Sequence, residues 1–579
     1  TQPGGLEPRV YSEILAYMLQ RNGVAASSNP LPQAMAMLNG LIVPAQPLVD
    51  RAFTPRILGY ATNGPVVPSS RLDRLTAVSN AMLLDPPEDD WLIWRRTHEN
   101  LGHSPLDQIN KDNVANMRLA WTWALPPGAN MMTPIVHDGV LFAYSFGDVV
   151  QAIDAATGDL LWGYQRELVT DAQLNSKKGV AIYQDKIIVP TSDVHLLALD
   201  SKTGKLLWDH EIDTGGETDH VIKAAPMVAN GKAIIGLTGQ RAVAGGNFIV
   251  AIDLDTGEEA WRFYTIARPG EPGGDSWNGL PLEERTGGSV WTPGSFDAEL
   301  NLVYFGPAPT YDTDALRIRA NLPNITTDAL YTNATIALNA DTGELVWHYQ
   351  HMRNDQLDHD WAFERQIIEL PVNGEMRKAI VTGGKQAIFE ALDAATGDYL
   401  FSIDLDMQNV ITEIDSRTGA KTLSAAAIPA PGQVLAGLSM NGICPDALGA
   451  RNMQSTSYNP ATGILYIPMQ DTCINNLTGK RWQKYPNPEQ DGLYGMMMAV
   501  DLKTREVLWT QREAAPPASG NLTTDGDLLF TGSIDRWFKA VDQASGEVLW
   551  RQRLDNGPSS YPITYRVDGR QYVAIATNA

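Results

Sequence analysis

The chain has 579 residues, a formal net charge of −23 at pH 7 and 44% hydrophobic residues. This acidity argues against binding to nucleic acid or to an anionic membrane surface. Apolar runs such as 186–190 and 233–237 are too short to span a bilayer, so we expect a soluble secreted or periplasmic protein.

The first 88 residues lie outside the repeat that fills the rest of the chain. Residues 10–23 have the pattern of an amphipathic helix, and Ser70 to Leu84 is a second helix candidate. The residues between them are rich in Pro, Asn and small side chains. We interpret 1–88 as a helical and irregular N-terminal arm, partly a linker, that lies on a main domain formed by 89–579.

An eleven-residue pattern, first seen as AIDAATGDLLW, occurs seven times in the main domain. In each copy a short β-run ends in Asp or Asn, a Thr/Ser-Gly turn follows, and a second run ends in Trp. Asp bonds its own turn and Gly supplies positive φ. Arg505 replaces Gly once, and Phe401 replaces Trp once. The copies occupy 152–162, 198–208, 251–261, 337–347, 391–401, 499–509 and 540–550.

Spacings of 41 to 54 residues between most copies fit one four-stranded sheet each, which is typical of a β-propeller. Residues 116–125, with Trp121 in a predicted strand, and the C-terminal hairpin at 561–576 would combine into an eighth sheet. The alternative is a set of unrelated hairpins with similar turns. We therefore predict an all-β, eight-bladed β-propeller in which one aromatic side chain per blade packs against the next blade's Gly turn. These aromatics are Trp121, Trp162, Trp208, Trp261, Trp347, Phe401, Trp509 and Trp550.

The chain contains two cysteines, Cys444 and Cys473. They are either inert buried thiols or a disulfide. Neither lies in a Cys-x-x-Cys-His run, so no c-type haem can attach to this chain.

From about Asp90 to its end, the sequence resembles the quinoprotein alcohol dehydrogenases, eight-bladed propellers that carry pyrroloquinoline quinone (PQQ). The resemblance rests on DDWLIWRRTHENLGHSPLDQINKDNVANMRLAW and on GICPDALGARNMQSTSYNPATGILYIPMQDTC. In the second segment the family has a Cys-Pro, an Asn eight residues later and a second Cys. The resemblance implies a disulfide between Cys444 and Cys473 and a quinone neighbour in Asn452.

The resemblance also implies catalytic roles. Trp291, in TGGSVWTPGSFD, matches the family's tryptophan beneath the quinone, the alternative being a core tryptophan. Asp358, in NDQLDHDWAFE, matches the general base, although the His and Trp that precede it in the family are replaced. Its alternative is an acidic surface loop. Lys385, in VTGGKQAIFEALD, matches the cation beside the quinone oxygens.

Further cofactor contacts are implied by position alone. Lys178 stands where the family has an Arg that pairs with a cofactor carboxylate, and Lys223 where it often has a Thr. Each lysine by itself would more often be solvated surface. The remaining predicted contacts are Gly239, Gln240 and Ser289.

The metal ligands depart from the family pattern. Gln240 or Arg241 replaces the family's Glu, and Pro309 replaces its Asn. Asp360 is a gain, because lanthanide-dependent members carry a second Asp there. We expect Ca²⁺ first, and a lanthanide second, held by Asp358, Asp360 and Gln240.

The implied activity is oxidation of an alcohol by PQQ. Members that act on small primary alcohols carry a ring of adjacent cysteines and a capping Trp over the quinone. Ala172-Gln173 and Ala518-Ser519 stand there instead, and the inserted loops 266–290 and 402–440 could form a new rim. We expect a bulky or secondary alcohol, as in sorbose, polyvinyl alcohol or trichothecene-type dehydrogenases. The alternative is a cofactor-free propeller scaffold of the cell envelope.

The electron acceptor follows from a weaker resemblance. Residues 4–23 resemble the last helix of a small c-type cytochrome, although an ordinary amphipathic helix fits nearly as well. We expect electrons to pass to a separate cytochrome c in the periplasm, with a signal peptide removed.

Overall fold

The computed structural model describes residues 66–168, 174–217, 219–239, 243–310, 313–428, 431, 441–475, 483–487 and 490–578. They belong to one compact unit, Leu58–Ala579. The predicted helix at 10–23, Gln240 and Ala172-Gln173 lie outside the described residues. Among the helices within these ranges, none combines the length and apolarity needed to cross a bilayer.

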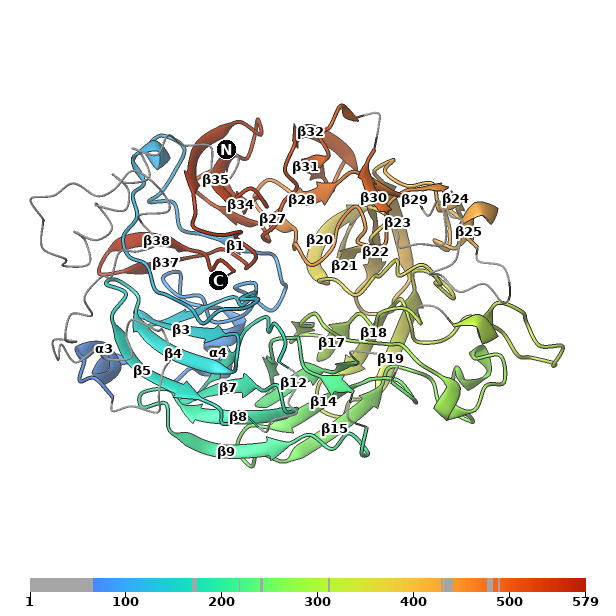
Figure 1. The fold of residues 1–579 in the computed structure, drawn as a ribbon, viewed down its shortest axis with the longest axis horizontal. Coiled ribbons are helices and arrows are strands. Elements are labelled where there is room, and N and C mark those ends of the chain that lie inside the picture. Colours follow the sequence, from blue (N-terminus) through green and yellow to red (C-terminus); the bar gives the residue numbers. More distant parts are fainter. Residues whose placement is uncertain are drawn as a thin grey trace, which may run out of the picture. The chain divides into compact units, whose positions relative to one another are not determined.

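Within the described residues the strands form six four-stranded sheets, one five-stranded sheet and four smaller sheets (Figure 1). The first three large sheets are β2 (Ile135–His137), β3 (Val140–Ser145), β4 (Val149–Asp154) and β5 (Leu160–Gln165); β6 (Ala181–Tyr183), β7 (Lys186–Pro190), β8 (His195–Asp200) and β9 (Leu206–Glu211); and β11 (Met227–Ala229), β12 (Lys232–Gly236), β14 (Phe248–Asp253) and β15 (Glu259–Tyr264). The next two are β16 (Ser295–Asp297), β17 (Leu302–Phe305), β18 (Ala334–Asn339) and β19 (Leu345–Gln350); and β20 (Gln366–Val372), β21 (Glu375–Gly383), β22 (Ile388–Asp393) and β23 (Tyr399–Asp404). The last two are β27 (Ser457–Asn459), β28 (Ile464–Gln470), β31 (Gly495–Asp501) and β32 (Glu506–Glu513); and β33 (Leu522–Thr524), β34 (Leu528–Gly532), β35 (Trp537–Asp542) and β36 (Val548–Arg553), with β1 (His103–Ser104) added in parallel to β33.

The smaller elements lie between and around these sheets. The smaller sheets are β10 (His220–Val221) with β13 (Thr238–Gly239), β24 (Ile411–Ile414) with β25 (Lys421–Leu423), β26 (Asn441–Ile443) with β29 (Thr472–Asn475) and β30 (Gln483–Pro486), and β37 (Ile563–Val567) with β38 (Arg570–Ala574). The helices are α3 (Ser70–Arg74) and α4 (Asn80–Leu84), with single 3₁₀ turns at Val114–Asn116, Gly274–Ser276, Leu282–Glu284, Asp314–Leu316 and Ala425–Ala427.

The repeated pattern forms the turn between the third and fourth strands of a sheet, and its tryptophan lies in the fourth strand. Trp162 in β5 donates its indole N–H to the Ser201 carbonyl of the next sheet at 2.9 Å. It also covers the turn at Gly204, where φ is +68° and a Cβ would lie 2.5 Å from the indole ring. Glycine is required there both for backbone conformation and for space. The same contact is made by five further tryptophans, namely Trp121, Trp208, Trp261, Trp347 and Trp509. The predicted docking on a glycine turn is thus confirmed for six of the eight aromatics, and the β-propeller architecture is confirmed with it.

The two exceptions to the pattern contact each other. Arg505 replaces the turn glycine with φ of 65°, and its guanidinium carbon lies 4.1 Å from the centre of the Phe401 ring. A phenyl ring leaves room for a side chain that an indole would fill, and the cation stacks on it. Phe401 and Arg505 thus take the places of the tryptophan and the glycine in one docking contact.

Replacing Gly343 by Ala is expected to cost more than the same change at Gly374. Both have positive φ, +73° and +88°, but a Cβ at Gly343 would lie 2.5 Å from the Trp261 ring, while nothing lies within 4 Å at Gly374. Backbone strain alone predicts a loss of about 1–2 kcal/mol for Gly374→Ala, and overpacking adds about 1–3 kcal/mol for Gly343→Ala. Denaturant midpoints measure both, and equal losses would contradict tryptophan docking as the cause.

Two local predictions are wrong. The expected helix from Ser70 to Leu84 is interrupted, because Val78 forms a β-bridge with Gln184 and Ser79 then caps α4. Residues 118–132, around the predicted strand with Trp121, form no strand. The next pairing along the chain is an isolated parallel bridge between Thr133 and Gly179. The Trp121 ring nevertheless covers Gly158, with 3.0 Å to a Cβ built there. The side chain docks even without the strand.

The described part of the arm packs on the first sheets. Leu72, Leu75, Val78 and Leu83 are buried in one core with residues of the first three large sheets. This burial agrees with an arm that lies on the propeller.

A short segment before the first sheet bonds the innermost strands of five sheets in turn. His98 contacts the Val228 carbonyl at 2.7 Å, and the carbonyls of residues 98, 99, 101 and 102 accept from the backbone of β16, β20, β27 and β33. The segment therefore pins the inner strands together.

The meander of each sheet also decides where functional side chains lie. In an antiparallel four-stranded sheet, the segment that enters the first strand and the loop between the second and third strands lie at the same edge. Lys178, Lys223, Trp291, Asp358 and Asn452 precede first strands. Gly239 and Lys385 follow second strands. Residues far apart in sequence thus share one edge of the propeller.

Candidate active site

Lys385 lies between two carboxylates. Its ammonium is 3.0 Å from Asp358 Oδ1 and 2.9 Å from Asp360 Oδ2, and it donates to the Asp358 carbonyl at 2.6 Å. Lys385 and Asp360 are buried, whereas the Asp358 side chain is 39% exposed. This cluster differs from a solvated acidic loop, because only one of its three members faces solvent.

The cluster shifts the protonation of its members. Burial, followed by repulsion from Asp360, raises the pKa of Asp358, although Lys385 opposes the shift. Burial also raises the pKa of Asp360. The two carboxylates raise the pKa of Lys385 against the effect of burial. A partly exposed carboxylate with a raised pKa beside a fixed cation suits proton transfer.

The loop that carries Asp358 is held from within. Buried Asp355 accepts from the backbone N–H groups of Leu357 at 2.9 Å and His359 at 2.6 Å. This turn places Asp358 at φ of 62°, a conformation that Asp and Asn tolerate better than most residues. Asp355 is therefore a structural carboxylate.

Buried aromatic and charged groups hold the chain just after Asp360. Trp361 stacks on His351 with ring centres 4.4 Å apart, and Lys421 lies 5.0 Å from the centre of the Trp361 ring. Glu390 accepts from His351 and Lys421, each at 2.6 Å. Lys421 comes from β25, so the inserted hairpin is tied to the back of the Asp358 loop.

A second group of predicted residues meets at Trp291. The Lys178 ammonium lies 5.3 Å from the centre of the Trp291 ring and donates to Tyr561 Oη at 3.1 Å. Phe363 meets Trp291 edge to face at 5.4 Å. Trp291 remains partly exposed, which argues against the alternative of a core tryptophan.

Lys178 is buried without a counterion. It is 5% exposed, and no carboxylate of the described residues forms an ion pair with it. Burial lowers its pKa to about 8. Lys223 is adjacent, since its carbonyl accepts from the Lys178 backbone at 3.0 Å, and burial with repulsion from Lys178 lowers its pKa. Neither lysine is ordinary solvated surface.

Tyr561 connects this group to Asn452. Its hydroxyl donates to the Met453 carbonyl at 2.8 Å, and Asn452 Oδ1 accepts from the Met453 backbone at 2.8 Å. Sequence reasoning missed Tyr561, together with Phe363 and the buried Arg451–Glu364 ion pair of 2.6 Å. The available signal was position: Tyr561 enters β37 just as Lys178 enters β6.

The remaining predicted contacts are not joined to these groups by any hydrogen bond within the described residues. Ser289 accepts from the Asn247 amide at 3.3 Å and its carbonyl accepts from Ala308 at 2.8 Å. Gly239 pairs with His220 between β13 and β10.

The residues present fit an anionic cofactor and, in part, a metal. Lys178 and Lys223, which form no ion pair with the described residues, offer cations to a molecule with carboxylates. Asp360 Oδ1 is buried and has no hydrogen-bond partner in the described ranges, as expected of an oxygen that meets an absent cation or donor. Because Lys385 contacts both carboxylates, a metal would share them with its ammonium.

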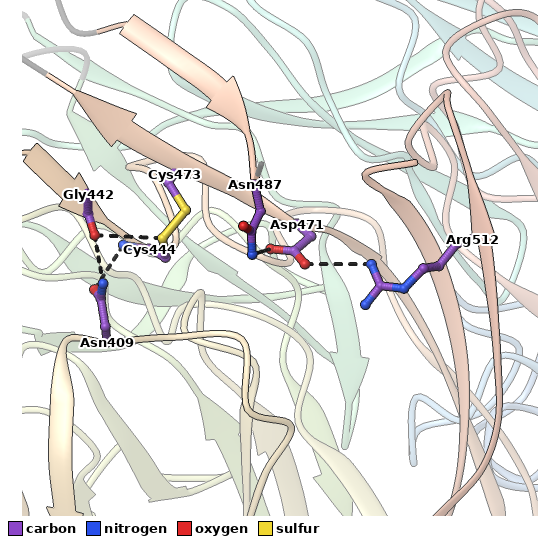
Figure 2. The surroundings of a disulfide bond; sticks show 7 residues. All are labelled: Asn409, Gly442, Cys444, Asp471, Cys473, Asn487 and Arg512. Atoms are coloured by element: carbon purple, nitrogen blue, oxygen red, sulfur yellow. Dashed lines mark hydrogen bonds and ion pairs between the residues drawn. A yellow bond between two sulfur atoms is a disulfide. The ribbon is translucent and has the colours of Figure 1, made fainter. Parts of the chain in front are cut away.

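The predicted disulfide between Cys444 and Cys473 is confirmed (Figure 2). Asn409 holds Cys444 from both sides, through its backbone N–H and its side-chain oxygen, each at 2.9 Å. Asp471 accepts from Asn487 at 3.2 Å and pairs with Arg512 at 3.5 Å. The bond ties the start of the segment that carries Asn452 to β29.

Replacing both cysteines by serine is expected to lower the free energy of unfolding by about 3 kcal/mol, the chain-entropy estimate for a loop of this length. The crosslink spans 29 residues. Denaturant unfolding of the variant and of reduced wild type measures the loss. Stability equal to oxidised wild type in both samples would contradict this expectation.

Known proteins resemble the chain over most of its length. The family model for "Glucose/ethanol/alcohol dehydrogenase, beta-propeller domain", named PQQ, matches residues 91–414 and 468–573. The dehydrogenase subunit of alcohol dehydrogenase (quinone) from Gluconacetobacter polyoxogenes is 32% identical over 90% of this chain and 75% of its own length.

Two solved structures share the fold. Quinohemoprotein alcohol dehydrogenase ADHIIG from Pseudomonas putida HK5 has a TM-score of 0.76 at 30% identity, covering 87% of this chain and 78% of its own. A europium-containing methanol dehydrogenase has a TM-score of 0.77 at 27% identity, covering 86% and 91%. The chain belongs to the family of PQQ-dependent quinoprotein alcohol dehydrogenases.

Proposed function

We propose that the chain oxidises a bulky or secondary alcohol to the ketone or aldehyde, with Asp358 as the general base. The observation that carries this proposal is the contact of Lys385 with both Asp358 and Asp360 at the edge where Lys178 faces Trp291. Asp358, as the most exposed of the three, takes the hydroxyl proton. Lys385 holds its carboxylate and carbonyl in place.

The other residues bind the cofactor. Trp291 supports the quinone rings, Lys178 and Lys223 pair with its carboxylates, and Asn452 offers a hydrogen bond. Gly239 and Ser289 complete the predicted contacts. PQQ supplies the acceptor for the hydride that leaves the alcohol carbon.

The metal ligands proposed are Asp358, Asp360 and Gln240. Hard oxygen donors suit Ca²⁺, which accepts flexible geometry, and a lanthanide is the second candidate. The buried Asp360 Oδ1 without a partner supports a cation at this position.

The proposed substrate class rests on what covers the site. Ser519 is buried and bonded to Gly532, so only the small, partly exposed Ala518 stands at the capping position. A small side chain in place of an indole leaves room above the quinone. An opened site favours large alcohols at a loss of affinity for small ones.

Reconstitution with PQQ and Ca²⁺ tests the proposal. We expect retained quinone absorption, reduction of an artificial electron acceptor, and a kcat/KM at least about tenfold higher for a bulky secondary alcohol than for ethanol. Retained quinone without turnover of any alcohol would contradict the activity. Ethanol as the best substrate would contradict the substrate class alone.

The eight-bladed count is also a proposal. The Gln571 backbone N–H donates to Gln108 Oε1 at 2.6 Å, and the Ile109 backbone N–H donates to Gln571 Oε1 at 2.7 Å. Trp121 and Tyr565 both donate to the Ala155 carbonyl. These contacts support an eighth blade that joins 116–125 with the C-terminal hairpin of β37 and β38. We further propose that residues 1–88 form an arm and that a cytochrome c accepts the electrons. We also propose a periplasmic location, which the disulfide supports because disulfides persist in oxidising compartments.

A further inference from the structure

A pocket lies beside the third large sheet, and none of the proposed catalytic or cofactor residues lines it. Arg268, Leu282 and Glu283 bring loop 266–290 to this pocket. Its volume is about 340 Å³, which falls in the range of small-molecule sites. Its walls come from β10, from the start of β14, from β15 and from the loop after β15.

One wall alternates aromatic rings and arginines. Phe248 and Tyr264 meet edge to face with ring centres 6.0 Å apart. The guanidinium carbon of Arg262 lies 4.1 Å from the centre of the Phe248 ring, and that of Arg268 lies 3.5 Å from the centre of the Tyr264 ring. A stacked guanidinium keeps its N–H edge available for an anion.

Only one of these arginines has its edge engaged. Arg262 donates to Glu259 at 3.0 and 2.6 Å and to the Asp213 carbonyl at 2.6 Å. The Arg268 guanidinium has neither an ion pair nor a hydrogen bond with another described residue, and its Nε is buried. Arg268 therefore presents to the pocket a stacked cation that no described residue pairs.

His220 adds a polar group in the wall. It is 5% exposed and lies edge to face on Phe248 at 5.3 Å. Neither ring nitrogen makes a hydrogen bond of standard geometry within the described ranges. Burial lowers its pKa, although the nearby Gly246 carbonyl opposes the shift. A neutral ring offers one N–H donor.

The acidic side chains of the pocket stand at its exposed rim. Asp213 and Glu283 are exposed and Glu217 is half-buried. We propose that this pocket binds a small carboxylic acid that carries hydroxyl or ammonium groups at its other end. The carboxylate meets Arg268 and His220, and the donor groups meet the acidic rim.

The rim also argues for a carboxylate over a phosphate. A phosphate dianion lacks the donors that would satisfy Asp213, Glu217 and Glu283, and it would be repelled by them. A planar carboxylate needs only the two N–H groups of one guanidinium edge and the imidazole.

Isothermal titration of the full-length protein tests the pocket with glucuronate, glucose and inorganic phosphate as probes. We expect glucuronate to bind, glucose not to bind measurably, and Arg268→Gln to weaken glucuronate by about tenfold or more. His220→Gln should weaken it less. Arg417→Gln, on an exposed turn, is the matched control and should bind as wild type does.

The outcomes separate this pocket from the proposed catalytic site. Weaker glucuronate binding in Arg268→Gln with wild-type binding in Asp358→Asn places the ligand in this pocket, whatever the activity proves to be. Loss of binding in Asp358→Asn would overturn the proposal. Unchanged affinity in Arg268→Gln, tighter binding of phosphate than of glucuronate, or binding of no probe would also overturn it.

Discussion

Replacing Asp358 by Asn is expected to reduce turnover by about 10²–10⁴-fold while PQQ stays bound, which is the usual loss when a general base is removed. Asn keeps the shape of the side chain and an oxygen for a metal, but it cannot accept the hydroxyl proton. The conformation at Asp358, with φ of 62°, is one that Asn also adopts readily. The loss should therefore report chemistry and not misfolding.

Asp491→Asn is the matched control for this change. Asp491 also has positive φ, 47°, and it lies in an exposed turn before β31. Its variant should keep wild-type kcat. Steady-state kinetics and the quinone absorption spectrum measure both variants after reconstitution. Near wild-type kcat in Asp358→Asn would assign the base to another carboxylate, with Asp360 the first to test.

The contacts of Lys385 are the reason we propose different roles for the two acids of this loop. Its ammonium contacts both, but it also donates to the Asp358 carbonyl, so it fixes the backbone of the residue that faces solvent. Asp360, at 5% exposure, cannot reach a substrate as Asp358 can. In the proposed mechanism a single lysine thus orients one carboxylate for proton transfer and leaves the other to a cation or to charge balance.

The repeat could be predicted because its determinants are local. Asp, Gly and Trp stand at fixed offsets, and each docking contact spans one sheet, as between Trp162 and Gly204. The compensation between Phe401 and Arg505 could not be predicted, because a long insertion separates the two copies in sequence. The Trp121 segment shows the converse, since its side chain docks although its backbone forms no ladder.

Four residues of the candidate site could be singled out from the sequence for a similar reason. Lys178, Trp291, Asp358 and Lys385 stand in segments whose position in each sheet is fixed by the repeat. Tyr561 was missed because its partner Lys178 is 383 residues away. The Arg451–Glu364 pair was missed because a buried ion pair leaves no periodic signal in a sequence.

Replacing Lys178 by Met is expected to weaken PQQ binding by about 10²-fold or more, while the protein without PQQ becomes more stable. Losing one partner of a buried charge pair typically costs 2–5 kcal/mol of binding, roughly 30- to 5,000-fold. Without PQQ the same lysine lowers the stability of the folded protein. Its pKa falls to about 8 from 10.5, so at pH 7 the folded state bears a cost of roughly 3 kcal/mol.

The lowered pKa of Lys178 also predicts how the stability of the protein without PQQ changes with pH. Between pH 8 and 10.5 the unfolded chain holds a proton at Lys178 that the folded protein has lost. The stability of the wild type without PQQ should therefore rise with pH across this window, and Lys178→Met should remove that part of the rise. Denaturant unfolding at several pH values measures it, and quinone titration measures the affinity.

Lys177→Met is the matched control, because the neighbouring lysine is equally buried but has protein partners. Its ammonium donates to Asn175 at 3.0 Å and Ser192 at 2.9 Å, and lies 3.8 Å from Asp148. Its loss leaves those groups buried with fewer partners, so we expect lower stability and nearly unchanged PQQ affinity. Wild-type affinity in Lys178→Met, or a loss of stability like that of Lys177→Met, would show that Lys178 serves the fold and not the cofactor.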